Sequence, residues 1–172
     1  MTDATLLALR LVHIFAGVFW AGTVFFLIRF LSPALDASGP AGGRVLKQLF
    51  MKQKIGIIIP ITAILAVLSG IWMYMRNVRG SDGAWAHSRP GMVFGVGGAA
   101  ALIALIAGAS MIGPSLEKIV KLGDAIEREG RAPTADETAT LLRLKARASL
   151  GTRIAAGMLA ITVAAMAIGR YV

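Results

Sequence analysis

Four long stretches without Asp, Glu, Lys or Arg constrain the fold of this chain more than any other feature. They cover residues 11–28, 55–75, 90–116 and 154–169 of the 172-residue sequence. A transmembrane helix needs about 20 predominantly apolar residues, so the second and third stretches qualify on their own and the first is just long enough. The last stretch reaches this length by extending back to residue 148, with Arg153 snorkelling to the interface. The sequence therefore predicts four transmembrane helices.

The predicted fold is an all-α membrane protein, a four-transmembrane-helix bundle that forms a single integral membrane domain over residues 1–172. The first helix is expected to stop before Pro33 and to remain uncleaved, because no basic segment precedes it. Pro60 is expected to free the carbonyl four residues before it, near the start of the second helix. The expected helices are about 5–31, 54–77, 90–112 and 148–170.

Residues 114–147 are predicted to form a helical hairpin that extends the third and fourth helices beyond the bilayer. Gly130 is a typical residue for the end of its first arm. Thr134 and Glu137 have the spacing of a capping box, which starts the second arm. No helix breaker follows before the fourth apolar stretch, so this arm is expected to continue into the fourth transmembrane helix.

The distribution of Lys and Arg predicts how the bundle is oriented. Residues 44–54 carry four of these cations and residues 118–153 carry eight, whereas the other side of the membrane has five. The positive-inside rule therefore places the hairpin in the cytoplasm and both termini outside. The expected location is the inner membrane of a bacterium, with the termini on the periplasmic side. The net charge of +9 is attributed to this topology and to anionic lipid head groups of the bilayer, not to nucleic acid.

His13 lies inside the first apolar stretch, and ionisable residues within a membrane helix are candidate functional sites. Helical spacing places His13, Gly17 and Trp20 on one face. That face combines an imidazole that can bind a metal, a position without a side chain and a large aromatic ring. It predicts either a slot for a flat cofactor or close packing against another helix.

The side chains that accompany His13 leave the identity of a bound metal open. A haem iron takes one or two axial ligands, commonly His or Met, whereas thioethers and imidazole also suit Cu(I). The candidates for a second ligand lie towards the outer side, and each methionine could equally be packing: His87, Met73, Met92 and Met166. Three outer arginines are candidates to pair with haem propionates or to anchor the interface: Arg76, Arg79 and Arg89.

Several other functional classes lack their signatures. The chain has no cysteine, which excludes disulfides, iron–sulfur clusters and thiolate metal sites. No acidic residue lies within a predicted span, which excludes an intramembrane Ser-His-Asp set and paired carboxylates. The third helix is rich in glycine and predicts close helix packing, including a homo-oligomer through this helix. Its glycines are Gly91, Gly95, Gly97, Gly98 and Gly108.

Short motifs in the chain resemble a known group of membrane proteins. The spacing of His13, Gly17, Trp20 and Gly22 is similar to that in the first helix of the copper-resistance-D-like proteins (CopD type) and of their relatives, the HemJ-type protoporphyrinogen oxidases. Three further segments carry the resemblance: residues 69–72 (Ser-Gly-Ile-Trp), the Trp85-xxx-Arg89 pair, and residues 166–171 at the end of the chain.

The resemblance implies a four-helix protein in which His13 holds a b-type haem. The HemJ type also needs a lysine where this chain has Arg89, and arginine does not readily release a proton. This departure speaks against the lysine-dependent oxidase chemistry.

Three hypotheses follow from the sequence. The first is a haem-b-binding membrane protein with an electron-transfer role, either porphyrinogen-oxidase-like or with a protein or a quinone as redox partner. His13 would then be the axial ligand, and Gly17 and Trp20 would line the haem. The second is a copper-handling membrane protein. The third is a structural or accessory membrane subunit without a cofactor.

Overall fold

The computed structural model describes residues 3–172 of the chain. Within them four continuous helical stretches are long and apolar enough to cross a membrane, and only 17–28% of each apolar window is buried inside the protein. Most of the apolar surface therefore faces outwards, as is expected when the surrounding lipid is as apolar as the side chains. The structure is an all-α four-helix membrane bundle, which confirms the predicted fold class. The four stretches are Ala4–Ala37, Ile55–Arg79, Arg89–Glu129 and Ala135–Ile168.

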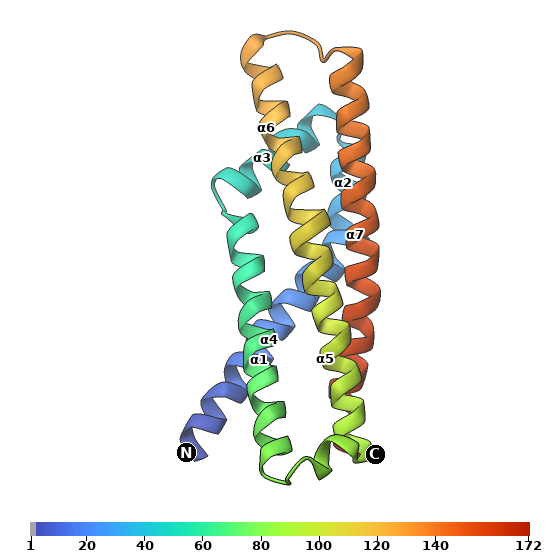
Figure 1. The fold of residues 1–172 in the computed structure, drawn as a ribbon. Coiled ribbons are helices and arrows are strands. Elements are labelled where there is room, and N and C mark those ends of the chain that lie inside the picture. Colours follow the sequence, from blue (N-terminus) through green and yellow to red (C-terminus); the bar gives the residue numbers. More distant parts are fainter. Residues whose placement is uncertain (1–2) are drawn as a thin grey trace.

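The bundle has two distinct ends, which are visible in Figure 1. One end holds the start of helix α1 (Asp3–Phe26), the end of helix α7 (Ala135–Ile168) and the connection after helix α4 (Ile55–Arg79), and we call it the terminal end. The opposite end, formed by residues 32–54 and 113–147, is called the hairpin end. This arrangement confirms that both predicted cytoplasmic segments lie on one side; which side is cytoplasmic remains a prediction.

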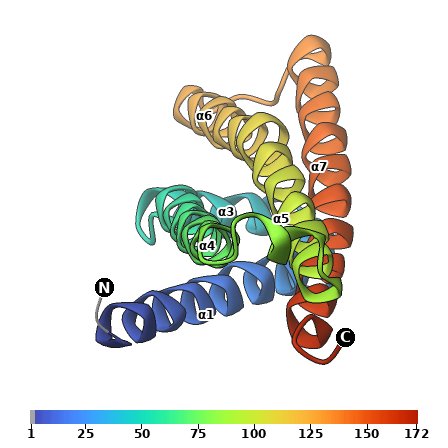
Figure 2. The same ribbon diagram turned by 60° about the horizontal axis from the view of Figure 1, so that its bottom comes forward.

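The four spans pack as two antiparallel pairs, α1 with α4 and α7 with helix α5 (Arg89–Ala107). Small side chains let the helices approach closely, and the core contains Ala104 at 1% exposure and Leu159 at 2%. The two pairs meet through α4 against α5 and α1 against α7. The first half of α1 diverges from α7 (Figure 2). His13 contacts α4, where its ring lies against Ala66 and Gly70.

The expectation that the first helix stops before Pro33 is wrong. After α1 the chain continues through a π-helical segment (η1, Leu27–Leu31) into helix α2 (Ser32–Ala37). Proline has no N–H to donate, but it lies here in the first turn of α2, directly after the wide π turn, so the missing donor does not break the helix. The chain turns only at Gly39, whose φ of 53° suits glycine.

Residues 40–51 lie outside the predicted helices, between the first and the second, but they form helix α3 (Pro40–Met51). Gly42 is buried against the backbone of Leu35 in α2, so a side chain at this position would not fit. Lys47 pairs with Asp124 and Glu127 of helix α6 (Gly113–Glu129). These contacts hold the connection between the first two spans against the hairpin.

Residues 114–147 form the helical hairpin that the sequence predicts, whereas its place beyond the bilayer stays a prediction. A second π-helical segment (η3, Gly108–Ile112) joins α5 to α6, and Gly130 ends α6 with a φ of 62°. Thr134 and Glu137 form the expected capping box. From there α7 runs without interruption into the fourth span.

A side chain of α7 contacts the backbone of η3. Nη2 of Arg147 donates to the carbonyl of Ser110 at 2.9 Å, four residues before Pro114, which has no N–H of its own to donate. This contact ties α7 to the π segment.

Candidate functional site

The imidazole of His13 lies between α1 and α4 in a small polar socket. Its Nδ1 is 2.7 Å from the backbone oxygen of Ala66 and 3.3 Å from Oγ of Ser69. Ser69 is buried, and its hydroxyl donates to the carbonyl of Leu65 at 2.6 Å. The socket therefore offers an intramembrane imidazole a carbonyl acceptor on the neighbouring helix, which offsets the cost of removing a polar ring from water.

The hydrogen bond to Ala66 determines which ring nitrogen of His13 carries the proton. A backbone carbonyl only accepts, so Nδ1 is the donor. In the neutral ring Nε2 then holds the free lone pair. Histidines that bind metals commonly donate their other N–H to a backbone carbonyl in this way.

Gly70 provides the space that the imidazole occupies. A Cβ at this position would lie 2.8 Å from Cε1 of His13 and 3.2 Å from its Nδ1. Any larger residue at position 70 would therefore push the ring out of the socket or push the two helices apart.

The two other residues on the predicted face have different surroundings. Gly17 is half-buried, and a Cβ there would have no neighbour within 4 Å. Trp20 is 5% exposed and packs in the core with Ala16, Val24 and Ala63. The structure thus leaves open space beside Gly17, whereas the indole is already used in helix packing.

The three predicted arginines lie exposed at the terminal end, and none forms an ion pair within residues 3–172. Arg76 and Arg79 follow Gly70 on α4 by six and nine residues, which places them about 120° and 180° around the helix from the socket. Arg76 is therefore the nearer of the two around the helix. Arg89 starts α5 and belongs to a different helix pair.

The predicted second ligands are spread over the terminal end. Met73 is half-buried on α4, one turn beyond Gly70 and on a nearby face. Met166 packs beside Gly97 in the α5–α7 interface, and Met92 is exposed on the outside of α5. His87 is exposed in a short 3₁₀ helix (η2, Ala84–His87). Among these residues, Met73 is the one that its helix position places near the socket.

An aromatic cluster closes the terminal end between α4 and α5. Tyr74 and Trp85 meet edge to face at 5.1 Å, and Trp85 stacks with Phe94 at 6.1 Å. Phe94 in turn fills the space beside Gly169 at the end of α7. This cluster gives Trp85, which took part in the family resemblance, a packing role.

Sequence reasoning missed the residues that form the socket on α4. Ser69 and Gly70 were noted only within a four-residue resemblance, and Ala66 was not noted at all. The available signal was a run of small residues at helical spacing, Ala66, Ser69 and Gly70, among bulky Ile, Leu and Val. Small residues at this spacing indicate a close contact with another helix, although they do not identify the partner.

The described residues contain no cluster of three or more His, Asp or Glu side chains that could hold a metal ion by themselves. Comparison of the chain with protein-family models, curated proteins and solved structures gives no match. The fold and the site define an integral membrane four-helix bundle with one oriented intramembrane imidazole.

Proposed function

We propose that this membrane protein binds haem b through Nε2 of His13 and serves in electron transfer. The observation that carries the proposal is the 2.7 Å contact from Nδ1 of His13 to the carbonyl of Ala66. It holds the ring in one orientation with Nδ1 as the donor, which in the neutral tautomer leaves Nε2 free for an iron. A bound haem would supply one-electron redox chemistry.

The residues beside His13 fit such a group in part. Gly17 leaves room next to the imidazole, as an apolar slot for a macrocycle requires. Met73 is the predicted methionine nearest to the socket, and Arg76 is nearer to it around α4 than Arg79, so these two are the candidates for a second ligand and for a propionate partner. Trp20 does not line this space as expected, because it is packed in the core. In this proposal its indole supports the helix that carries His13.

A bundle without a cofactor is the second candidate, and two observations favour it. The hydrogen bond between His13 and Ala66 links α1 to α4 without a cofactor, and Trp20 is already buried in the core. In that case His13 would serve helix packing. A copper-handling role has less support, because Met92 and Met166 lie on the α5–α7 pair, whereas His13 lies on α1.

The visible spectrum of the purified protein tests the proposal. The protein is purified in detergent and its spectrum is recorded in the oxidised and dithionite-reduced states, beside His13→Ala and the control His87→Ala. We expect a Soret band that shifts on reduction, is lost in His13→Ala and is retained in His87→Ala. A colourless protein that takes up no added haemin would overturn haem binding. Copper analysis of the same sample would then separate the copper hypothesis from the packing role.

A further inference from the structure

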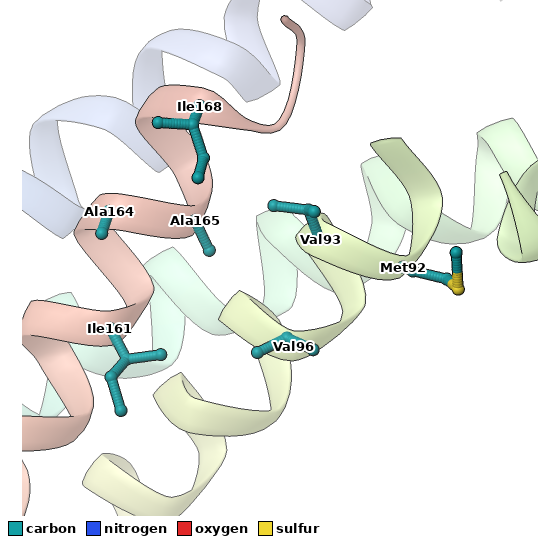
Figure 3. Close-up of a pocket in the computed structure, with 7 residues that line it drawn as sticks. All are labelled: Met92, Val93, Val96, Ile161, Ala164, Ala165 and Ile168. Carbon is teal, nitrogen blue, oxygen red and sulfur yellow. The ribbon is translucent and has the colours of Figure 1, made fainter. Parts of the chain in front are cut away.

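A shallow apolar groove runs along the outside of α5 and α7, on the helix pair that does not carry His13. Figure 3 shows side chains of both helices bordering it, with Met92 and Val96 on one side and Ile161 and Ile168 on the other. Its volume is about 380 Å³, within the range of small-molecule sites. Met92 is 53% exposed and Val96 60% exposed, so the groove opens to the surroundings of the bundle.

One cation continues the α5 wall of this groove. Arg89 precedes Met92 by three residues, Val93 by four and Val96 by seven, and these spacings place all four on the same helical face. Arg89 is exposed, and within residues 3–172 its guanidinium has neither a carboxylate partner nor a hydrogen bond.

Arg89 and the groove lie at different depths along the membrane normal. The third span begins at Arg89, at the end where Tyr74 and Trp85 form an aromatic cluster of the kind found at membrane interfaces. The lining side chains on α7 cover seven residue steps, about 10 Å of helix, and lead from that interface into the span. The surface therefore has a charged residue, Arg89, at the depth of the interface and the apolar groove deeper in the membrane.

We propose that this surface is a binding site for an anionic phospholipid. The phosphate of the head group would accept hydrogen bonds from Arg89, because a guanidinium matches phosphate oxygens in charge and geometry. One acyl chain would lie along the groove between α5 and α7. In this proposal Arg89 binds a lipid head group and not a haem propionate. The proposal does not depend on whether His13 binds haem.

Charge complementarity favours a lipid over a second copy of the chain. Two copies related by a two-fold axis along the membrane normal would meet with their Arg89 residues at the same depth. Two unpaired guanidinium groups would then repel each other across the contact, whereas the phosphate of a lipid neutralises the one that is present.

Native mass spectrometry of the full chain tests the site. The detergent-purified protein is stripped of lipid and titrated separately with phosphatidylglycerol and with phosphatidylcholine of the same acyl chains. We expect one tightly retained phosphatidylglycerol per monomer, bound about tenfold more strongly than phosphatidylcholine. Both lipids carry a phosphate, but the choline of phosphatidylcholine offsets the charge of its own phosphate and competes with Arg89 for it.

Three variants separate the parts of the proposed site. Arg89→Gln removes the cation and is expected to abolish the preference between the two lipids. Val96→Trp fills the groove at an exposed position and is expected to weaken retention of both. Arg10→Gln is the matched control, because Arg10 is also exposed at the terminal end and lies outside the groove; it should behave like the unmodified protein.

Four results would overturn the proposal. They are equal retention of the two lipids by the unmodified protein, an unchanged preference in Arg89→Gln, an equal loss in Arg10→Gln, and a dimer that lipid does not dissociate. The last result would assign the groove to a second copy. Retention unchanged by Val96→Trp would contradict the position of the acyl chain.

Discussion

At the scale of single residues, the account rests on how three positions on α4 place the imidazole of His13 on α1. The carbonyl of Ala66 orients Nδ1 of His13, Ser69 adds a hydroxyl at 3.3 Å, and Gly70 leaves the space for the ring. Helical spacing in the sequence predicted the face of His13 and Gly17. It could not predict the socket, because the partner of a helical face depends on which helix packs against it.

The space at Gly70 predicts the effect of adding one methyl group. Gly70→Ala would place a Cβ 2.8 Å from Cε1 of His13, so the ring or the helix must shift. We expect a loss of about 1–3 kcal/mol of stability, as is typical of overpacking, together with loss of any His13-dependent haem band. Thermal unfolding in detergent measures the first effect and the visible spectrum the second.

Gly17→Ala is the control for this substitution, since a Cβ at Gly17 has no neighbour within 4 Å. Its unfolding midpoint should be equal to or slightly above that of the unmodified protein, because alanine has the higher helix propensity. If both variants lose stability equally, the space at Gly70 has no special role.

At the scale of elements, the sequence predicted the apolar spans and the hairpin cap well, because these follow from local rules. The Thr134–Glu137 capping box and the end of α6 at Gly130 are determined by their own residues. The π segments and α3 could not be predicted in this way. Pro33 indicates a helix end by local rules, yet the wide turn of η1 carries the helix past it. Helix α3 is held by contacts with α2 and α6, which no local rule contains.

The hairpin cap predicts a dependence on pH at acidic values. Arg131 lowers the pKa of Glu137 from 4.5 to about 2, helped by the backbone N–H of Thr134. A carboxyl with a lowered folded-state pKa contributes stability that is fully present above pH 4.5 and is lost as the pH falls towards 2.

The thermal midpoint of the full chain, followed from pH 6 to pH 2.5, measures this contribution. We expect a decrease that is smaller in Glu137→Gln, because glutamine retains the capping-box geometry without the titrating group. An identical pH profile for the two proteins would show that the ion pair with Arg131 contributes nothing.

The contact between α3 and α6 predicts how the connection to α4 responds to protease. Asp124 raises the pKa of Lys47, and Lys47 in turn lowers that of Asp124, mainly through their hydrogen bond. Lys47→Ala removes this pairing, so α3 should separate more often from α6 and trypsin should cleave faster at Lys52 and Lys54. Gel analysis of a digestion time course gives the rate.

Lys121→Ala is the matched control, because its partner Glu117 lies on the same helix. Its cleavage rate after α3 should stay unchanged. High salt should reduce the difference between Lys47→Ala and the unmodified protein, since exposed ion pairs are screened. A difference that persists in high salt would contradict an electrostatic origin.

At the scale of the whole molecule, the structure places both termini at one end of the bundle and the hairpin at the other. The distribution of Lys and Arg predicts on which side of the membrane each end lies. The chain has no cysteine, so single-cysteine variants report on one position each. Ala84→Cys marks the terminal end and Ala132→Cys the hairpin end, both at exposed positions.

In intact bacterial cells that express the protein, or in spheroplasts, an impermeant maleimide should label Ala84→Cys directly. It should label Ala132→Cys only after the membrane is opened, because the positive-inside rule places the hairpin in the cytoplasm. The reverse pattern would invert the topology, and labelling of both positions in intact cells would contradict a four-span bundle.

The most direct test of the central claim is the protonation pattern of His13 in the protein without a cofactor. Selective ¹⁵N labelling of histidine gives signals from only two residues, and His87→Ala removes one of them. We predict that Nδ1 of His13 carries a fixed proton, because it donates to the carbonyl of Ala66, and that the neutral ring has its free lone pair on Nε2. A ring with its proton on Nε2, or one that exchanges rapidly between the two tautomers, would contradict the socket and leave His13 without an oriented metal-binding nitrogen.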